Sequence, residues 1–227
     1  MCGRFSMTIT EEVIKDNFDD IRIDFPMQVS YNVAPTHNSY VITNDKPHRL
    51  QYFTWGLVPY WSEDGENKGR LINARKEGIA GKISFRIPIR KQRCLVLADS
   101  FYEWKKNGYT KIPYRVVPID GDLMVMAGIW DVWQQNDRII KSFTIITTDA
   151  NREMSEYHTR MPVLLQTKAQ QNAWLSDLPL ENVLGMLQTP KDGSVLIYRV
   201  SEKVNFVEIN TPELHDEIPE PPNLFTL

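Results

Sequence analysis

Three stretches decide the fold: Arg-Cys-Leu-Val-Leu-Ala-Asp at residues 93–99, Leu-Met-Val-Met-Ala-Gly-Ile-Trp at 123–130 and Ile-Ile-Lys-Ser-Phe-Thr-Ile-Ile-Thr-Thr at 139–148. Each is a run of apolar and β-branched residues of strand length, and turn signals such as Asn107-Gly108 and Asp120-Gly121 separate them. Runs of this kind between turns predict buried β-strands. Weaker strand patterns occur at residues 40–43, 49–56, 71–74, 113–118 and 195–200. The chain is therefore predicted to consist mainly of β-structure.

Helical patterns are fewer than strand patterns. Thr10 and Thr167 are candidate N-caps for helices over residues 10–18 and 167–175, and further helices are expected at 149–157 and, behind Pro179, at 180–187. Together these elements predict an α+β fold, with one domain built on a mixed, mostly antiparallel, barrel-like sheet and peripheral helices. Residues 1–212 are expected to form this domain. The acidic, proline-rich residues 213–227 are expected to form an extended C-terminal tail.

The composition is that of an ordinary globular protein, because 42% of the 227 residues are hydrophobic and 24% are charged. No stretch approaches the ~20 apolar residues of a transmembrane helix, and residues 1–6 lack the apolar centre of a signal peptide. We therefore expect a cytoplasmic protein without a membrane partner, and a monomer. Cys2 and Cys94 are the only cysteines, and no His, Cys and Asp spacing is typical of a metal site. Free thiols, no metal and no cofactor are expected.

The net charge of −3 conceals a strong segregation of charge along the chain. Residues 68–115 contain thirteen Lys and Arg and three acidic residues, so this basic segment carries +10 and the remainder carries −13. The segregation either disperses over the folded surface or produces a positive face. A positive face would attract a polyanion such as a nucleic acid.

Cys2 is the most informative single residue, because removal of Met1 would place a thiol and a free α-amine on the same residue. The ordinary pKa of an α-amine is about 7.7–8.0, so part of it is uncharged and nucleophilic near neutral pH. With an aldehyde, the amine can form a Schiff base and the thiol can then close a five-membered thiazolidine ring. Position alone does not distinguish this chemistry from a cysteine that is simply exposed at a chain end.

Two titratable side chains are candidates for proton transfer. Glu103 follows Phe101 and Tyr102 and precedes Trp104, and burial among these aromatic residues would raise its pKa, whereas a solvated strand end would not. His158 lies where a helical pattern gives way to an extended one, which suits either proton transfer near neutral pH or a structural capping role.

Polar and aromatic residues elsewhere are candidates for ligand binding. Asn73 and Arg75 alternate with apolar residues, so a strand would direct both side chains to one face. Trp61 is the tryptophan expected to be exposed, since it precedes a polar loop at residues 62–68. Exposed aromatic residues beside basic ones are typical of single-strand binding. His37, His48 and His215 lie in polar surroundings and are interpreted as surface residues.

Several of these fragments are parts of longer motifs that occur along the first 165 residues. The motifs are Met1-Cys2-Gly3-Arg4-Phe5, Tyr31-Asn32-Val33-Ala34-Pro35, Trp55-Gly56-Leu57-Val58-Pro59, Asn73-Ala74-Arg75, Arg93-Cys94-Leu95-Val96, Ala98-Asp99-Ser100-Phe101-Tyr102-Glu103-Trp104, Ala127-Gly128-Ile129-Trp130, Thr147-Thr148-Asp149-Ala150-Asn151 and His158-Thr159-Arg160-Met161-Pro162. In this order they resemble the SRAP family (SOS response-associated peptidase). The chain departs from the family pattern at Glu77-Gly78 and at Leu97.

The resemblance implies a protein that senses abasic sites in single-stranded DNA and links itself covalently to them. By likeness to the family, Cys2 supplies both nucleophiles, Asn73 holds the adduct, Glu103 assists opening of the sugar ring, and His158 acts as acid and base around the imine. The resemblance also implies that Arg4, Arg75 and Arg160 contact DNA and that Pro35 and Trp61 pack against bases beside the lesion. Abasic-site lyase activity and self-processing at Met1 are further implications.

Two alternatives remain open at the level of sequence. A cysteine peptidase would use Cys2 to attack an amide, with His158 or its own α-amine as the base, as N-terminal-nucleophile hydrolases do. A non-covalent single-stranded DNA-binding protein would use only arginine and tryptophan side chains. Replacement of Cys2 by Ala distinguishes them, because pure binding would survive and crosslinking would not.

Overall fold

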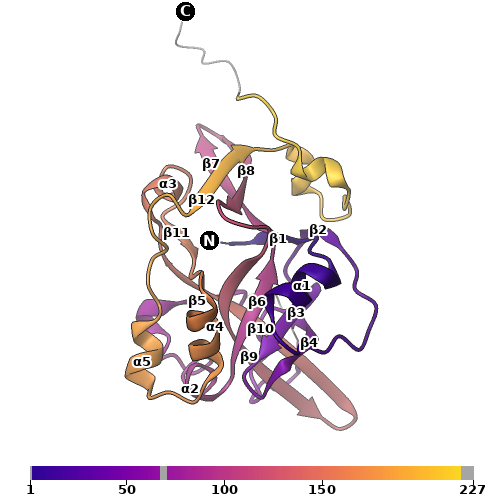
Figure 1. Cartoon of the computed structure of the whole chain (residues 1–227), viewed down its shortest axis with the longest axis vertical. Coiled ribbons are helices and arrows are strands. Elements are labelled where there is room, and N and C mark those ends of the chain that lie inside the picture. Colours follow the sequence, from indigo (N-terminus) through magenta and orange to yellow (C-terminus); the bar gives the residue numbers. More distant parts are fainter. Residues whose placement is uncertain (1, 67–70, 221–227) are drawn as a thin grey trace, which may run out of the picture.

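The computed structural model describes residues 2–66 and 71–220. It contains two sheets and a set of short helices (Figure 1). The strands are β1 (Arg4–Met7), β2 (Ser30–Val33), β3 (Asn38–Thr43), β4 (Lys46–Trp55), β5 (Asn73–Arg75), β6 (Arg93–Ala98), β7 (Ser100–Asn107), β8 (Thr110–Pro118), β9 (Met124–Gln135), β10 (Arg138–Asp149), β11 (Arg160–Pro162) and β12 (Val195–Arg199). The α-helices are α1 (Glu11–Asn17), α2 (Pro88–Lys91), α3 (Arg152–Ser155), α4 (Lys168–Leu175) and α5 (Leu180–Gly185). The 3-10 helices are η1 (Lys76–Gly78), η2 (Glu202–Asn205) and η3 (Pro212–His215).

The larger sheet closes on itself. Its strand order is β11-β10-β4-β3-β6-β9, and β9 also pairs with β10, so five of these strands form a ring. Among the named strands of the described residues, the pairings of β10 with β4 and with β5 are the parallel ones. The predicted α+β fold, with a mixed, mostly antiparallel, barrel-like sheet, is confirmed.

The three stretches that predicted the fold supply β6, β9 and β10. Every residue of β6 is buried, because β6 lies between β3 and β9 inside the ring. Gly128 in β9 permits the close approach of β6: a Cβ at this position would lie 2.7 Å from Val96 Cγ2 and 2.9 Å from Cys94 Sγ. A larger residue would force these two strands apart.

The smaller sheet has the order β12-β8-β7-β1-β2 and lies above the ring in Figure 1. The first strand, β1, joins the two parts of the core. The buried ring of Phe5 on β1 makes an edge contact with the buried ring of Trp55 on β4, with centroids 4.9 Å apart. Such aromatic contacts add to the free energy of area burial.

The expected helices differ in how well they match the structure. Thr10 caps α1, and Thr167 and Gln170 form a capping box at the start of α4, so both of these predictions are confirmed. The helix expected over residues 149–157 is reduced to α3. Strand β10 extends to Asp149, where β11 pairs with it, and Asn151 then caps the short helix through Met154 N.

The chain after β12 folds back over the smaller sheet, and we call residues 201–220 the C-terminal strap. Val204 and Leu214 of the strap are fully buried beside Tyr102 of β7. Ile218 N donates to Arg199 O over 3.0 Å. The boundary expected between residues 212 and 213 thus falls inside a packed segment. Residues 213–220 of the expected tail lie on the domain, and residues 221–227 lie outside the described residues.

Candidate functional site

Strand β1 carries Cys2 to the place where the two sheets meet. Pairing of Arg4 with Tyr102 and of Phe5 with Val33 holds β1 between β7 and β2. The Cys2 side chain is fully buried, and its Sγ lies 3.8 Å from Arg4 O. Burial raises the pKa of the Cys2 thiol, and the negative charge of Glu103 raises it further. In this form of the chain Cys2 is therefore a neutral thiol.

Asn73 approaches Cys2 from the larger sheet. It begins β5, which runs parallel to β10, and Ala74 is buried in the core while Arg75 is exposed. The Asn73 amide Nδ2 donates to the backbone carbonyl of Cys2 over 2.7 Å. This hydrogen bond connects the two sheets at Cys2.

Glu103 and His158 lie at the same place. Glu103 is 3% exposed on β7, so of the two alternatives that the sequence left open the structure shows the buried one. Together with Gly3, the two residues are part of the lining of a pocket of about 740 Å³. Burial lowers the pKa of His158, and the charge of Glu103 opposes that shift. The fold thus brings together four residues that span more than 150 positions of the sequence: Cys2, Asn73, Glu103 and His158.

The backbone fixes the orientation of the His158 ring. The turn after α3 is closed by a hydrogen bond from His158 N to Met154 O, and Arg160 N donates to His158 Nδ1 over 2.9 Å. Because Nδ1 accepts this bond, the proton of the neutral ring is assigned to Nε2. A lowered pKa keeps the ring neutral at pH 7, so His158 can both give and take a proton there.

The three arginines expected to contact DNA differ in their hydrogen-bond and ion-pair partners. Arg4 Nη1 donates to Asn32 Oδ1 at 2.7 Å and to Val204 O at 2.9 Å. Two nitrogens of the Arg160 guanidinium group, Nη1 and Nη2, donate to the two carboxylate oxygens of Glu77, at 2.7 and 3.0 Å, and Nη1 also donates to Asp149. Arg75 is exposed, and no ion pair involves it in the described part of the chain.

Pro35 and Trp61 both lie in turns. His37 N donates to Ala34 O across the turn that contains Pro35, which is half-buried. The Trp61 side chain is 46% exposed, as expected from the sequence, in a turn closed by a bond from Ser62 N to Pro59 O. Neither residue lines the pocket of Glu103 and His158.

The basic segment does not form one continuous positive face. Arg93 is 1% exposed, and its guanidinium donates to the carbonyls of Trp174, Ser176, Ile89 and Arg90. Its role is to join α2 and the end of α4 to the ring. Lys106 and Lys111, in contrast, line the pocket. Lys68 and Arg70 lie outside the described residues.

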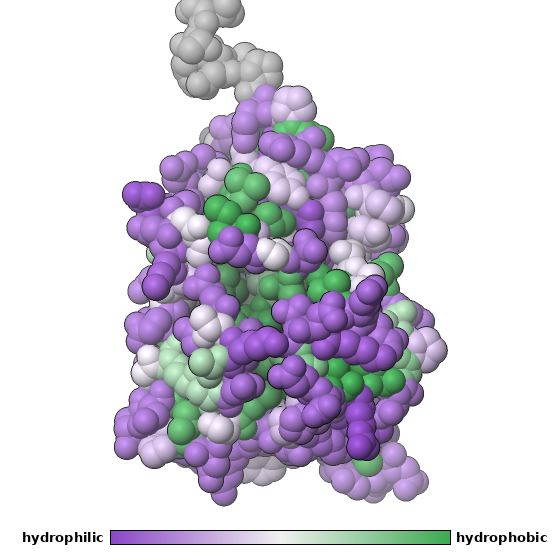
Figure 2. All heavy atoms as spheres, viewed as in Figure 1, coloured by the Kyte–Doolittle hydropathy of each residue, from purple (hydrophilic) through white to green (hydrophobic). Residues whose placement is uncertain are grey.

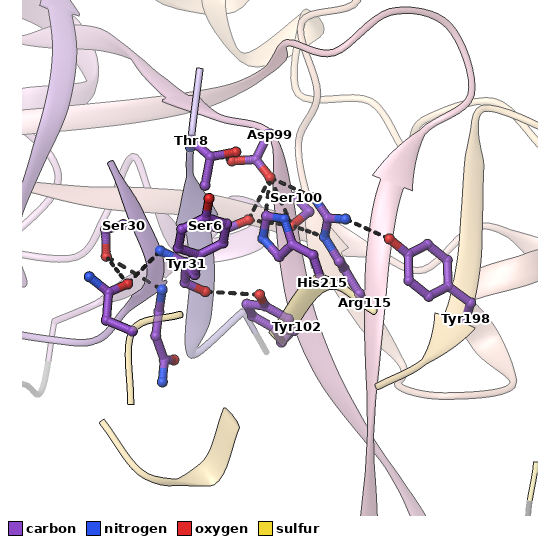
Figure 3. A network of polar contacts seen from close by, with 12 residues as sticks. Ser6, Thr8, Ser30, Tyr31, Asp99, Ser100, Tyr102, Arg115, Tyr198 and His215 are labelled. Carbon is purple, nitrogen blue, oxygen red and sulfur yellow. Dashed lines mark hydrogen bonds and ion pairs between the residues drawn. The ribbon is translucent and has the colours of Figure 1, made fainter. Parts of the chain in front are cut away.

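A buried polar network behind β1 was not found from the sequence. Asp99 accepts hydrogen bonds from Ser6 Oγ, Thr8 N and Arg115 Nη2, each at 2.7 Å. His215 Nε2 of the strap lies 3.7 Å from the same carboxylate. Figure 3 shows these side chains directed toward Asp99 from β1, β8 and the strap. Asp99 thus connects the strand that carries Cys2 to the C-terminal strap.

The face of the molecule seen in Figure 2 is hollowed. Figure 2 shows a recess with apolar side chains across the middle of this face, between largely hydrophilic upper and lower parts. β1 lies at the same height in Figure 1.

Within residues 2–66 and 71–220, no group of three His, Cys, Asp or Glu side chains is arranged to hold a metal ion. None of the helices in those same ranges is long and apolar enough to cross a membrane.

The fold and the site define a single-domain α+β protein with a buried cysteine at position 2, held between two sheets beside Asn, Glu and His. Residues 1–207 match the family described as SOS response associated peptidase (SRAP). The chain belongs to this family.

Relatives and solved structures agree with this assignment. Abasic site processing protein YoqW of Bacillus subtilis is 38% identical over 221 residues, which cover 94% of this chain and 98% of that protein. Abasic site processing protein HMCES of Gallus gallus is 32% identical over 81% of this chain and 65% of that protein. A crystal structure of a protein from Bacteroides thetaiotaomicron is 28% identical, with a TM-score of 0.87 over 96% of this chain and 100% of that one.

Proposed function

We propose that this protein recognises abasic sites in single-stranded DNA and binds them covalently through Cys2 after Met1 has been removed. The observation that carries the proposal is that Asn73 binds the carbonyl of Cys2, while Gly3, the next residue, lines one pocket together with Glu103 and His158. The names of the relatives, abasic site processing proteins, agree with it. An abasic deoxyribose is in equilibrium with an open-chain aldehyde, which is the partner that an N-terminal aminothiol requires.

The chemistry proceeds in balanced steps. Hydrolysis of the Met1–Cys2 bond consumes one water and releases methionine. The freed α-amine of Cys2 attacks the aldehyde carbon, and loss of one water gives a Schiff base. The Sγ of Cys2 then adds to the imine carbon while its proton passes to the imine nitrogen, which closes the thiazolidine ring. The adduct therefore contains the protein and the DNA less one water.

Neighbouring side chains have separate roles in these steps. Asn73, which binds the Cys2 carbonyl, holds the residue in place while its amine and thiol react. Glu103 assists the opening of the sugar ring by transferring a proton. His158, neutral at pH 7 because burial lowers its pKa, exchanges protons with the hydroxyl and amine groups around the imine.

The DNA strand on either side of the lesion is contacted by arginine side chains and by two wedge residues. Arg75 is exposed and ready to bind a phosphate, and Arg4 and Arg160 contact the strand from positions set by their internal partners. Pro35 and Trp61 pack against the bases beside the lesion.

Two further activities share the same groups. Before the ring closes, the Schiff base acidifies the neighbouring carbon, so removal of a proton there expels the 3′ phosphate in a lyase reaction. Closure of the thiazolidine ring suppresses this route. The Cys2 thiol, once His158 has taken its proton, is also the nucleophile for self-processing at Met1. It displaces the Cys2 amide nitrogen to give a thioester, and water then hydrolyses the thioester and releases methionine.

The experiment that tests this proposal compares the wild-type protein with Cys2→Ala on single-stranded DNA with and without one abasic site. We expect a stable adduct only for the wild type with abasic DNA, and equal binding of intact DNA by both proteins. Equal retention of abasic DNA by both proteins under denaturing conditions would contradict the role of Cys2. Failure of the wild type to form an adduct, with DNA binding intact, would favour a non-covalent binding protein.

A further inference from the structure

The pocket that contains Glu103 and His158 has an outer half that the proposed chemistry does not use. This half is lined by Lys106, Thr110 and Lys111 from the β7–β8 hairpin, and by Glu202 and Asn205 from the C-terminal strap. Trp104 also lines the pocket, and its Nε1 donates to Asn205 Oδ1 over 2.8 Å. The hairpin, the strap, Glu103 and His158 thus line one and the same pocket.

The sheet leaves this extension open on one side. Strand β1 pairs with β7 only at Ser100, Phe101 and Tyr102. Beyond Tyr102, β7 continues to Asn107 with β8 as its neighbour on the other side. No described strand pairs with the β1-facing edge of this outer part of β7. A DNA strand bound at Cys2 can therefore leave the pocket along the β7–β8 hairpin.

Two lysines face each other across this hairpin. Lys106 and Lys111 are direct partners in the β7–β8 ladder, which places their side chains on the same face of the sheet. Both are exposed, and within the described ranges neither makes an ion pair, whereas the adjacent Lys105 lies 4.0 Å from Glu156 and over the ring of Tyr157. Like charges directly opposite one another are unfavourable, and an anion between them removes the repulsion.

We propose that Lys106 and Lys111 together bind one backbone phosphate of the single-stranded DNA, next to the nucleotide held at Cys2. This inference rests on the proposed function, and it adds a contact on the smaller sheet to those expected from Arg75 and Arg160 on the larger one. The strand crosses the pocket and leaves over the β7–β8 hairpin. Glu202, the acidic residue of the outer half, opposes the phosphate and weakens its binding.

The test measures binding of an undamaged, fluorescently labelled single-stranded oligonucleotide by anisotropy over a range of NaCl concentrations. The site variant is Lys106→Gln/Lys111→Gln. The control, Lys46→Gln/Lys168→Gln, removes the same charge at two residues that do not line this pocket. We expect the site variant to lose about tenfold in affinity at low salt, with a salt slope smaller by about 0.7, the value for one single-strand phosphate. The control should keep the wild-type slope.

Two further measurements complete the test. At saturating DNA the site variant should give the wild-type yield of adduct with an abasic oligonucleotide, because the two lysines bind the strand and take no part in the chemistry. Glu202→Gln should bind undamaged DNA more tightly at low salt. Equal effects of the two double variants, or weaker binding by Glu202→Gln, would overturn the proposal. Failure of the proposed function is distinguishable, because the wild type itself would then form no adduct.

Discussion

Arg75 on β5 and Arg160 on β11 carry the same charge, and both strands pair with β10, but the two side chains have different surroundings. Arg160 is bound by Glu77, Asp149 and the carbonyl of Thr147, and its side chain is 11% exposed. We expect Arg160→Ala to lower the free energy of unfolding by about 2 kcal/mol as well as to weaken DNA binding. Arg75→Ala should change stability by less than about 0.5 kcal/mol and weaken only DNA binding.

Chemical denaturation and salt-dependent DNA binding on both variants check this contrast. A destabilisation of similar size in the two variants would show that the buried contacts of Arg160 contribute little. An unchanged salt slope for Arg75→Ala would show that this side chain binds no phosphate.

Asn73 contributes one hydrogen bond at the reacting residue. Asn73→Ala removes the donor to Cys2 O, and a lost hydrogen bond of this kind is worth about 1 kcal/mol. Since 1.36 kcal/mol corresponds to a tenfold change in rate, we expect adduct formation to slow about fivefold. Single-turnover kinetics with abasic DNA measure this rate, and binding of intact DNA serves as the control. A variant that reacts at the wild-type rate would remove Asn73 from the mechanism.

Local sequence predicted the exposure of some residues and not the partners of others. The exposure of Trp61 follows from its immediate neighbours and is confirmed, whereas the neighbours of Glu103 left open whether its side chain is buried, as it is, or solvated. His215, interpreted as a surface residue, packs against Tyr31 with ring centroids 4.8 Å apart. Arg4 finds its partners at Asn32 and Val204, and separations of this length leave no local signal.

Strands with continuous apolar runs were predictable, and the shortest strands were not. β6, β9 and β10 are buried on both faces, so their sequences carry a strong hydrophobic signal. β1, β2 and β11 have three or four residues each, too few for a clear alternation. Their strand conformation comes from pairing with distant segments rather than from local propensity.

The C-terminal strap yields a prediction at the scale of one element. Leu214 is fully buried beside Tyr102, so Leu214→Ala should cost about 2–5 kcal/mol. For a chain of this size that lowers Tm by about 5–15 °C. The neighbouring Glu213 is exposed, and Glu213→Ala should leave Tm within about 2 °C of the wild type. Scanning calorimetry on the two variants checks this, and an unchanged Tm for Leu214→Ala would mean that the strap is not held by its apolar contacts.

At the scale of the whole molecule, a partly buried histidine, His215, makes the free energy of unfolding depend on pH. Burial and the charge of Arg115 lower the pKa of His215 to about 4, against the opposing charge of Asp99. A histidine whose pKa is lowered on folding binds fewer protons when folded than when unfolded. Its contribution is therefore fully present above the unfolded pKa of about 6.5 and is lost as pH falls toward 4.

The His215→Asn variant isolates this contribution from the other titrating groups. Between pH 7 and pH 4 we expect the wild type to lose on the order of 1–2 kcal/mol more stability than the variant, after allowance for solvent screening of a partly exposed ring. Denaturation curves at both pH values measure the difference. Equal losses of stability in the two proteins would mean that the His215 ring is solvated in the folded state and that it does not link the strap to Asp99.

The central claim is that the Cys2 amine and thiol together close a ring on an abasic site. Intact-mass spectrometry of the processed protein, incubated with abasic single-stranded DNA and no borohydride, tests it most directly. The predicted mass is that of protein plus DNA less one water. Cys2→Ala should give an adduct only after borohydride trapping, as a secondary amine with the mass of the variant plus DNA less one water plus two hydrogens, and a chain that keeps an N-terminal extension should give none. A stable Cys2 adduct on a chain that retains the extension would contradict the claim, because its nitrogen would still be in a peptide bond.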